Sequence, residues 1–234
     1  VLIDIPMDVQ QEEVGDEIIQ PFEFKTTLSD SQAADAIERI KNHFISSERP
    51  LVLFGAGVGL ADASDHILNF IKENNLPFVS SWNGSAFFNH ENENYYGSIG
   101  VYGNRGANFL LQSADKILVL GSRLDNRQRG NVKKFAPMAD ILVFDIDQGE
   151  LDKHKNDKNY SMQLFDFKNS ENIFKSIKLD NILSEEWTKY CTEIKQKYYG
   201  VWPSSSAKKY ESLNPYDVVK KINSNIQIIS ERFP

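Results

Sequence analysis

The chain has 234 residues, enough to bury one substantial core with connecting segments beside it. A hydrophobic content of 41% and a charged content of 25% are typical of soluble globular proteins, and the net charge of -7 disfavours nucleic acid as a partner. No apolar run approaches the roughly 20 residues of a membrane span and no secretory leader is recognisable, so we expect a cytoplasmic protein without a membrane partner.

Both ends of the chain are predicted to lie outside the central fold. Residues 1–10 begin with VLIDIP, an apolar run ending in proline, which indicates either the last strand of a preceding domain or an added edge strand. Residues 11–29 carry acids without a sustained apolar period, as a linker would. Residues 200–213 are also linker-like, and residues 214–234 start a new helix with Asn214 as cap and Pro215 in the first turn.

Residues 30–199 are predicted to form one α/β domain. Apolar runs of strand length cover 51–54, 77–81, 116–120, 141–147 and 161–165. Helical patterns lie between most of them and after the last, over 30–50, 62–75, 105–113, 170–178 and 184–199. This alternation predicts a doubly wound, mostly parallel sheet with helices on both faces, and Asp30 is expected to cap the first helix.

A glycine-rich turn follows the first of these strands. Gly55-Ala56-Gly57 lies between strand and helix, as in nucleotide-binding units where backbone amides at the helix start face phosphate. The dinucleotide fingerprint is incomplete, because Leu60 stands where glycine or alanine is expected. The next strand ends in Ser80-Ser81-Trp82 and supplies no acid for an adenosine ribose. A plain NAD-type site is therefore disfavoured.

Charged residues follow two later strands at the same edge of the predicted sheet. Arg123 and Arg127 come just after Gly121, where α/β proteins bind ligands, and they suit either a planar anion or ordinary surface ion pairs. Asp145 and Asp147 end the strand ILVFDID, where they suit ribose or adenine donors or simply solvent. We expect the glycine-dense segment YYGSIGVYGN to be a loop, passing close to a ligand or forming a tight turn.

Several kinds of catalytic motif are missing from the sequence. The four histidines form no helical zinc pair, and neither a P-loop nor a G-x-S-x-G turn is present. Cys191 is the single cysteine, and its helical pattern with Trp187 and Ile194 favours a packed thiol over a nucleophile. These residues favour a binding domain over a self-sufficient enzyme.

Five segments together resemble a known family. VLIDIPMDVQ, RPLVLFGAGVG, GSIGVYGNRGAN, ADKILVLGSRLDNRQRG and ILVFDID, in this order and spacing, are similar to the central part of thiamine-diphosphate enzymes of the acetolactate synthase type. The similarity runs from Val1 to about Leu164, and NPYDVVKKI resembles the start of a third domain. The resemblance implies that residues 1–10 end a pyrimidine-binding domain and that residues 214–234 begin a diphosphate-binding domain.

The resemblance also implies an activity for the parent protein. Such enzymes decarboxylate a 2-oxo acid and carboligate the product, using thiamine diphosphate and Mg²⁺. The activating glutamate belongs to the first domain and the magnesium motif to the third, so both cofactors are expected outside this chain, which alone should not be catalytic. The implied partners are the flanking domains, a small 2-oxo acid and further copies of the protein in a homo-oligomer.

A cofactor site within the chain follows from the same resemblance. In acetolactate synthases the central domain binds FAD, whereas related decarboxylases bind ADP or nothing there. Matched by position, the cofactor-binding residues are Gly55, Ala56, Gly57, Ser81, Trp82, Asn83, Gly100, Val101, Tyr102, Gly121, Arg123, Asp125, Arg127, Asp145 and Ile146. Val101-Tyr102 replaces the family's Met-His, and Asp125-Asn126 replaces two aspartates. Three possibilities therefore stay open: the domain binds FAD, it binds ADP, or it is a vestigial spacer that binds nothing.

Overall fold

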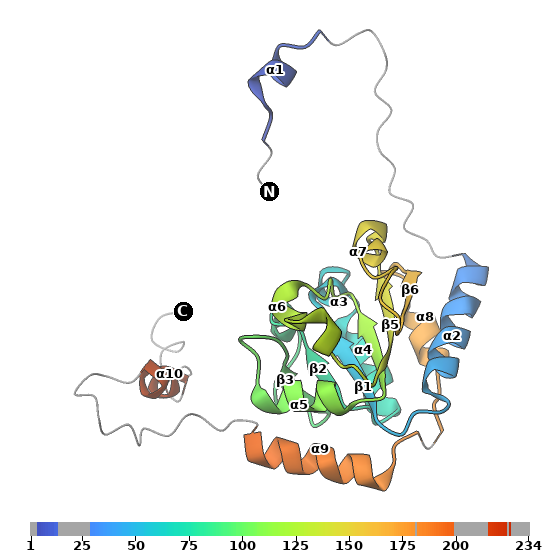
Figure 1. Cartoon of the computed structure of the whole chain (residues 1–234), viewed down its shortest axis with the longest axis vertical. Coiled ribbons are helices and arrows are strands. Elements are labelled where there is room, and N and C mark those ends of the chain that lie inside the picture. Colours follow the sequence, from blue (N-terminus) through green and yellow to red (C-terminus); the bar gives the residue numbers. More distant parts are fainter. Residues whose placement is uncertain (1–3, 14–28, 181, 199–214, 224, 226–234) are drawn as a thin grey trace.

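A computed structural model describes residues 4–13, 29–180, 182–198, 215–223 and 225. Six strands form one sheet in the order β3-β2-β1-β4-β5-β6, and every neighbouring pair is parallel (Figure 1). The strands are β1 Pro50–Phe54, β2 Phe78–Ser80, β3 Tyr95–Ser98, β4 Lys116–Leu120, β5 Asp140–Asp145 and β6 Tyr160–Leu164. The predicted fold class is confirmed. Among the described helices, none has the length and apolar character that crossing a membrane requires.

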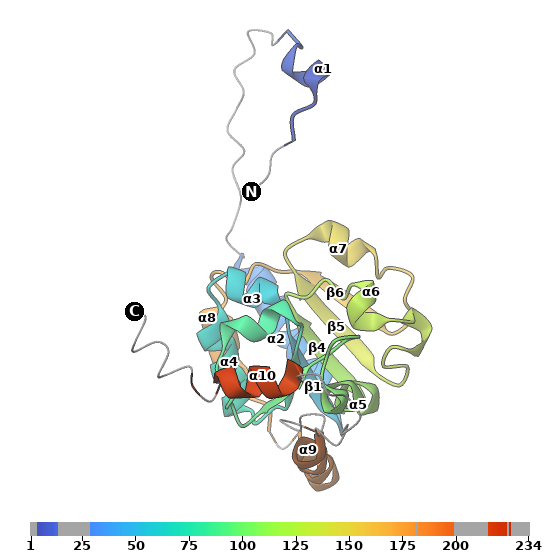
Figure 2. The same cartoon turned by 90° about the vertical axis from the view of Figure 1, so that its left-hand side faces the viewer.

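The sheet separates two hydrophobic cores because side chains alternate along each strand. On β1, Val52 and Phe54 belong to one core, and Leu51 and Leu53 to the other. Helices pack on both faces of the sheet (Figure 2). The first core is covered by α2 Asp30–Phe44, α4 Ser64–Glu73 and α8 Glu171–Ser176, and the second by α5 Arg105–Ser113 and α7 Gln148–Asp152.

The first long helix is capped one residue earlier than predicted. The Ser29 hydroxyl accepts a hydrogen bond from the backbone N–H of Gln32, whose side chain accepts in turn from the Ser29 N–H. Asp30, the predicted cap, is the first helical residue, because a glutamine three residues after Ser29 completes a capping box. The helix ends at Phe44, well before Pro50, which begins β1.

Other elements also differ from the sequence prediction. Tyr95–Ser98 is the edge strand β3, although the whole glycine-dense segment was expected to be a loop. The helix predicted over 62–75 is α4, and a separate short helix that was not predicted, α3 Ala56–Leu60, precedes it, with Asp62 at a positive φ of 57° between them. Asp4–Pro6 is not in a strand, and α1 Met7–Gln10 follows it. The remaining short helices are η1 Asn83–Phe87, α6 Asn126–Arg129 and η2 Val132–Lys134.

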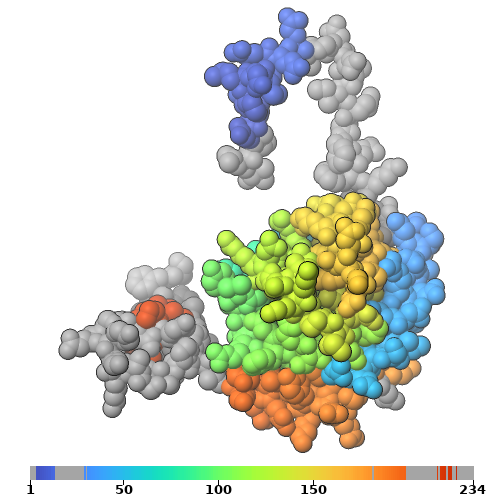
Figure 3. Space-filling model, in the orientation of Figure 1, coloured from blue at the N-terminus to red at the C-terminus, as the bar shows by residue number. Residues whose placement is uncertain are grey.

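Two helices follow the sheet in the chain. α9 Glu185–Tyr198 runs along the end of the domain opposite α7 (Figure 3), and α10 Pro215–Asn223 comes near the C-terminus. Both were predicted, although Asn214 lies outside the described residues. Residues 14–28 and 200–213, predicted to be linkers, also lie outside the described ranges, so the proposed domain boundaries stay predictions.

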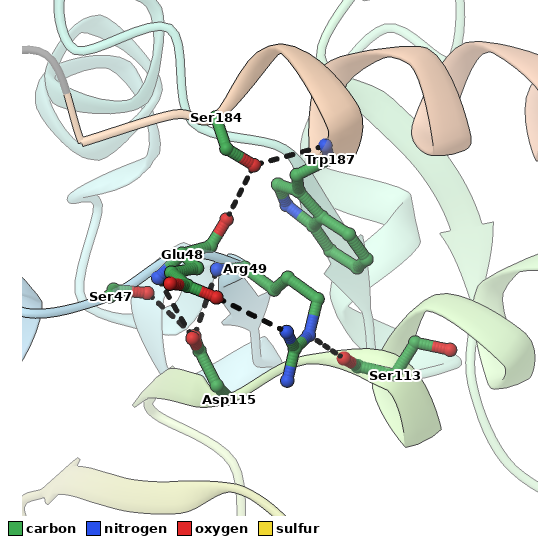
Figure 4. A network of polar contacts seen from close by, with 7 residues as sticks. All are labelled: Ser47, Glu48, Arg49, Ser113, Asp115, Ser184 and Trp187. Carbon is green, nitrogen blue, oxygen red and sulfur yellow. Dashed lines mark hydrogen bonds and ion pairs between the residues drawn. The ribbon is translucent and has the colours of Figure 1, made fainter.

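Asp115 organises the loops at the amino-terminal edge of the sheet. Its carboxylate accepts hydrogen bonds from the Ser47 hydroxyl at 2.7 Å and from the backbone N–H groups of Glu48 at 2.8 Å and Arg49 at 3.0 Å (Figure 4). These bonds hold the pKa of Asp115 below its usual value, although partial burial opposes them. The Arg49 Nε donates to the Ser113 carbonyl at 2.7 Å.

The same network fixes α9 to the sheet. The Ser184 hydroxyl donates to the Glu48 carbonyl at 3.1 Å and accepts from the Trp187 N–H at 3.1 Å, so it caps the helix and ties it to the loop before β1 (Figure 4). The buried indole of Trp187 donates to the Pro50 carbonyl at 3.0 Å. Cys191, one turn later, is buried beside Trp187, and burial raises the pKa of its thiol to about 12. It is a packed thiol, as predicted.

Candidate functional site

A cavity of about 650 Å³ opens at the carboxyl edge of the sheet. β2 and β3 lie on one side of β1 in the sheet, and β4 lies on its other side. The loops that follow β1 and β4 therefore lead away from each other. In open α/β sheets this reversal of strand order forms the ligand crevice. The cavity, which we call the cleft, lies within the 300–1,000 Å³ typical of small-molecule sites.

The structure brings most of the predicted site residues together in the cleft. Its lining includes twelve of them: Ala56, Gly57, Ser81, Trp82, Asn83, Val101, Tyr102, Gly121, Arg123, Asp125, Arg127 and Asp145. Gly55, Gly100 and Ile146 are not in the lining. Gly55 lies beneath the turn against Gly121, Gly100 packs behind Arg127, and the Ile146 side chain is exposed outside. Ligand binding by all fifteen residues stays a prediction.

Some lining residues were not predicted. Beside Asp147, which the sequence placed at the same edge, they are Leu60, Ser98, Ile99, Ser122, Gln128 and Glu150. Ser98 and Ile99 were missed because β3 was taken for a loop. Ser122 directly follows Gly121, and Glu150 lies in the first turn after ILVFDID, so position alone could have suggested both.

The turns after β1 and β4 touch each other through their backbones. The Gly57 N–H donates to the Gly121 carbonyl at 2.9 Å, and a Cβ atom on Gly55 would lie only 2.1 Å from the same oxygen. Glycine is therefore required by the packing of one turn on the other. This corrects one expectation, because the Gly57 amide is engaged within the protein and does not face a phosphate.

The turn after β4 is strained and positions charged residues. Gly121 has φ of 60° and Leu124, a fully buried residue, has φ of 47°. The left-handed region is unusual for a bulky side chain, and such strain gathers at functional sites. Burying Leu124 leaves its neighbours Arg123 and Asp125 in the cleft wall.

Two of the acids have local structural roles. Asp125 is the N-cap of α6, where its carboxylate accepts from the Arg127 N–H at 2.8 Å and the Gln128 N–H at 3.0 Å. Asp147 caps α7 in the same way, accepting from the Gly149 N–H at 2.7 Å. Their presence in the lining is thus explained in part by helix capping.

The predicted arginine pair is split by its surroundings. The Arg123 Nε lies 3.2 Å from Oε1 of Glu150, and the Lys153 Nζ lies 2.5 Å from Oε2 of the same carboxylate. The exposed Arg127 guanidinium forms no hydrogen bond or ion pair with any residue that the structure describes. Arg127 is therefore the cation of the cleft that is available to an anionic ligand without breaking an existing pair.

Asp145 and two aromatic residues complete the cleft. Asp145 is nearly buried, which raises the pKa of its carboxyl group, and it accepts from the Asp147 N–H at 3.0 Å. At the mouth, the rings of Trp82 and Tyr102 lie 5.7 Å apart between centroids, and both are exposed together with Leu60 and Val101. Such a group of exposed apolar side chains is suited to covering a planar ring.

The sequence itself matches a known family over this region. Residues 34–163 match the family described as "Thiamine pyrophosphate enzyme, central domain". The chain belongs to this family. The resemblance found in the sequence is thereby confirmed, and the cleft lies wholly within the matched residues of this thiamine pyrophosphate enzyme domain.

Curated relatives of this central domain are acetolactate synthases. The "Acetolactate synthase isozyme 2 large subunit" of Escherichia coli (strain K12) is 30% identical over 154 residues, covering 65% of this chain and 27% of that protein. The "Probable acetolactate synthase large subunit" of Methanococcus aeolicus is 32% identical over 164 residues, covering 67% and 27%. The chain thus spans about a quarter of the length of these relatives.

Proposed function

We propose that this chain is the central domain of an acetolactate synthase-like enzyme, which decarboxylates a 2-oxo acid and carboligates the product. The family match and the names of the relatives support this assignment. Within the proposal, residues 30–199 are the central domain, and residues 1–10 and 214–234 belong to neighbouring catalytic domains joined by linkers. We further expect a cytoplasmic homo-oligomer.

The cleft is proposed to bind an adenine-containing diphosphate, with FAD as first choice and ADP as alternative. The carrying observation is the exposed Arg127 guanidinium, which has no partner among the described residues, in a cleft of about 650 Å³ at the reversal of strand order. Arg127 would bind the diphosphate, and Asp145 would accept from ribose or adenine donors. Trp82 and Tyr102 would cover the second planar ring of FAD, which in acetolactate synthases is mostly structural.

A vestigial spacer that binds nothing is the alternative function. The lining carries four carboxylates, on Asp125, Asp145, Asp147 and Glu150, against two guanidinium groups, of which Arg123 is already paired. This excess of acid disfavours an anion unless Arg127 dominates the local field. This excess of negative charge in the lining is the observation that favours the spacer function.

Calorimetric titration of the purified chain with FAD, ADP and NAD separates the two functions. The proposal expects heat with FAD, weaker heat with ADP and none with NAD, together with a rise in melting temperature for whichever ligand binds. Absorbance in the flavin bands of the purified protein gives an independent check. If none of the three ligands gives heat or a melting shift, the spacer function is correct.

Thiamine diphosphate and Mg²⁺ are placed outside this chain. Magnesium needs carboxylate and phosphate oxygens in a near-octahedral array, and the proposal assigns both the magnesium motif and the activating glutamate to the neighbouring domains. We therefore expect no measurable release of carbon dioxide when the isolated chain is assayed with thiamine diphosphate, Mg²⁺ and pyruvate. Turnover above the cofactor's own background would overturn the assignment as a central domain.

A further inference from the structure

The short helix α6 supports two walls of the cleft at once. It carries Arg127, whose carbonyl accepts a hydrogen bond from the Val101 N–H at 2.9 Å. A Cβ atom on Gly100 would lie 2.8 Å from the same carbonyl, so the loop after β3 is seated closely on α6. The positions of the Arg127 guanidinium and of the Val101-Tyr102 segment therefore depend on where α6 is held.

Apolar packing does not hold α6 in place. The helix has four residues, and none of them is buried in the way that core residues are. A helix of one turn is unstable by itself, so its position must come from polar contacts, among them the hydrogen bond from the Ser122 hydroxyl to the Gln128 side chain at 2.9 Å. Asp125 supplies such contacts at the first turn, and Arg129 supplies them at the last.

Arg129 reaches away from the cleft into a buried polar cluster. Its Nη1 lies 3.2 Å from the Asp157 carboxylate and 3.3 Å from Nδ1 of His154, and its side chain is only 10% exposed. His154 is 1% exposed and stacks on Tyr160 of β6 with ring centroids 4.9 Å apart. Arg129 does not line the cleft, so it would act on a ligand only through α6.

We propose that Arg129, held by His154 and Asp157, is a positioning residue that anchors α6 and so fixes Arg127 and the Val101-Tyr102 loop in their cleft positions. The consequence for ligand affinity rests on the proposed function of the cleft, whereas the anchoring itself does not. Two polar groups of the cluster, the Arg129 Nε and the Tyr160 hydroxyl, are buried without a partner among the described residues.

Protonation of His154 is expected to weaken this anchor. Nδ1 of His154 lies 3.3 Å from both the Arg129 Nη1 and the Asp157 Oδ2, so the neutral ring accepts from the guanidinium in one tautomer and donates to the carboxylate in the other. Burial, the largest effect, and the nearby Arg129 lower the pKa of His154, whereas Asp157 and Glu150 oppose the shift. Tyr160, the remaining titratable group against the ring, stacks on its face.

The sign of the pH effect follows from the direction of that shift. The folded protein binds the His154 proton more weakly than the unfolded chain does, so the anchor is intact above the ordinary value of 6.5 and weakens as the pH falls below it. Protonated Nδ1 can only donate, so it competes with Arg129 for the Asp157 carboxylate and places a second cation beside the guanidinium. Acidic pH should therefore loosen α6 before it unfolds the domain.

Hydrogen exchange on the chain without ligand tests the anchor directly. Arg129→Met removes the donors but keeps the apolar stem, and we expect about tenfold faster exchange at the amides of Val101 and Gly130, with the sheet amides unchanged. Arg105→Met removes a cation from an exposed position and is the matched control, which should leave both amides as in the wild type. Unchanged exchange in Arg129→Met would overturn the proposal.

A second variant separates positioning from simple stabilisation, and it serves if Arg129→Met fails to fold. The substitution His154→Asn keeps an acceptor near the Nδ1 position but removes the titrating ring, so exchange at Val101 and Gly130 should lose its dependence on pH between 7 and about 5.5. An equal pH dependence in both proteins would count against the anchor. FAD titration of Arg129→Met then adds the functional arm, with about tenfold weaker binding expected. Altered exchange without any FAD binding in the wild type would leave the anchor established and sink only the proposed cleft function.

Discussion

Polar side chains are hydrogen-bonded within the protein at the amino-terminal edge of the sheet, whereas several are exposed at the carboxyl edge. At the amino-terminal edge, the Asp115 carboxylate accepts three hydrogen bonds and the buried indole of Trp187 donates to a backbone carbonyl. At the carboxyl edge, the Arg127 guanidinium has no partner among the described residues and Trp82 is 65% exposed. Groups satisfied within the protein stabilise it, whereas groups left exposed and unpaired at a cleft are available to a ligand.

The two tryptophans give the sharpest test of this contrast. Trp187→Ala should lower the free energy of unfolding by about 3–5 kcal/mol, because it leaves a large cavity beneath α9 and removes the hydrogen bond to Pro50. Trp82→Ala should change it by less than about 0.5 kcal/mol. Urea denaturation of both variants is the measurement. Comparable losses would show that the carboxyl edge is built for stability as well.

Two glycines test whether the turn after β4 is special. Gly121 and Gly130 both have φ of 60°, but a Cβ atom on Gly121 would lie 2.7 Å from the Val58 nitrogen, whereas one on Gly130 would meet nothing within 4 Å. Gly130→Ala should cost about 1 kcal/mol from backbone strain, and Gly121→Ala about 3 kcal/mol because the clash is added. Equal melting temperatures of the two variants would mean that the contact between the turns relaxes freely.

Acid should destabilise the protein through His43. Its Nε2 donates to the Ile117 carbonyl at 3.2 Å, and burial lowers the pKa of its imidazole to about 4. The folded state therefore binds this proton later than the unfolded chain, and stability is lost as the pH falls from about 6.5 to about 4, by up to about 3 kcal/mol.

His43→Gln keeps a donor for Ile117 without a titrating ring, so its unfolding free energy should fall less steeply over this pH range. His66 and His154 also have lowered pKa values, so part of the slope should persist. Denaturation curves of the variant and the wild type between pH 7 and pH 4 would reveal the difference. Parallel slopes would show that His43 is less buried in solution.

The sequence predicts the fold well because its strands are continuous apolar runs. The strand predicted over 116–120 coincides with β4, and the one predicted over 141–147 matches β5 except that β5 ends at Asp145, since both faces of these strands are buried. β3 was missed because it is a four-residue edge strand with Gly97 inside it, and only alternate positions are buried. Ser29 and Asp30 are equally good caps by residue type, and the interaction with Gln32 that decides between them is a detail of local geometry.

The position of the cleft could be predicted from the carboxyl ends of the strands, but the ion pairs among its residues could not. Arg123 and Glu150 lie in loops after β4 and β5, and no sequence pattern states that one reaches the other. Arg127 and Arg129 look alike in the sequence, yet one is exposed at the cleft and the other is turned into a buried cluster. The capping roles of Asp125 and Asp147 were not predicted, because the short helices that follow them were not expected.

The different surroundings of Arg127, which is free of ion pairs among the described residues, and Arg123, which is paired with Glu150, predict different effects on ligand binding. Arg127→Ala should weaken FAD binding about ten- to hundredfold, because it removes a charge-assisted bond worth roughly 1.5–3 kcal/mol. Arg123→Ala should weaken it less than about fivefold, since Arg123 would have to leave Glu150 to reach a ligand. Calorimetric titration of both variants decides the matter, and a larger effect at Arg123 would show that the Glu150 pair opens on binding.

The smallest expected effect concerns which diphosphate the cleft prefers. Trp82 and Tyr102 form an exposed aromatic pair in the lining of the cleft, which also carries the acids that suit an adenosine. Such a pair contributes about 0.5–1.5 kcal/mol to stacking on a planar ring, and FAD has a second ring whereas ADP has none. Trp82→Ala should therefore weaken FAD binding about two- to tenfold and leave ADP binding unchanged.

Two further variants decide whether that loss comes from the ring itself. Trp82→Phe keeps an aromatic face and should restore most of the FAD affinity, whereas Val101→Ala trims an exposed apolar neighbour at the same mouth and should have little effect. Because Trp82 is exposed, its own fluorescence should be quenched by FAD and unaffected by ADP. Equal losses for FAD and ADP in Trp82→Ala would place the adenine at the mouth and reverse the proposed orientation of the ligand.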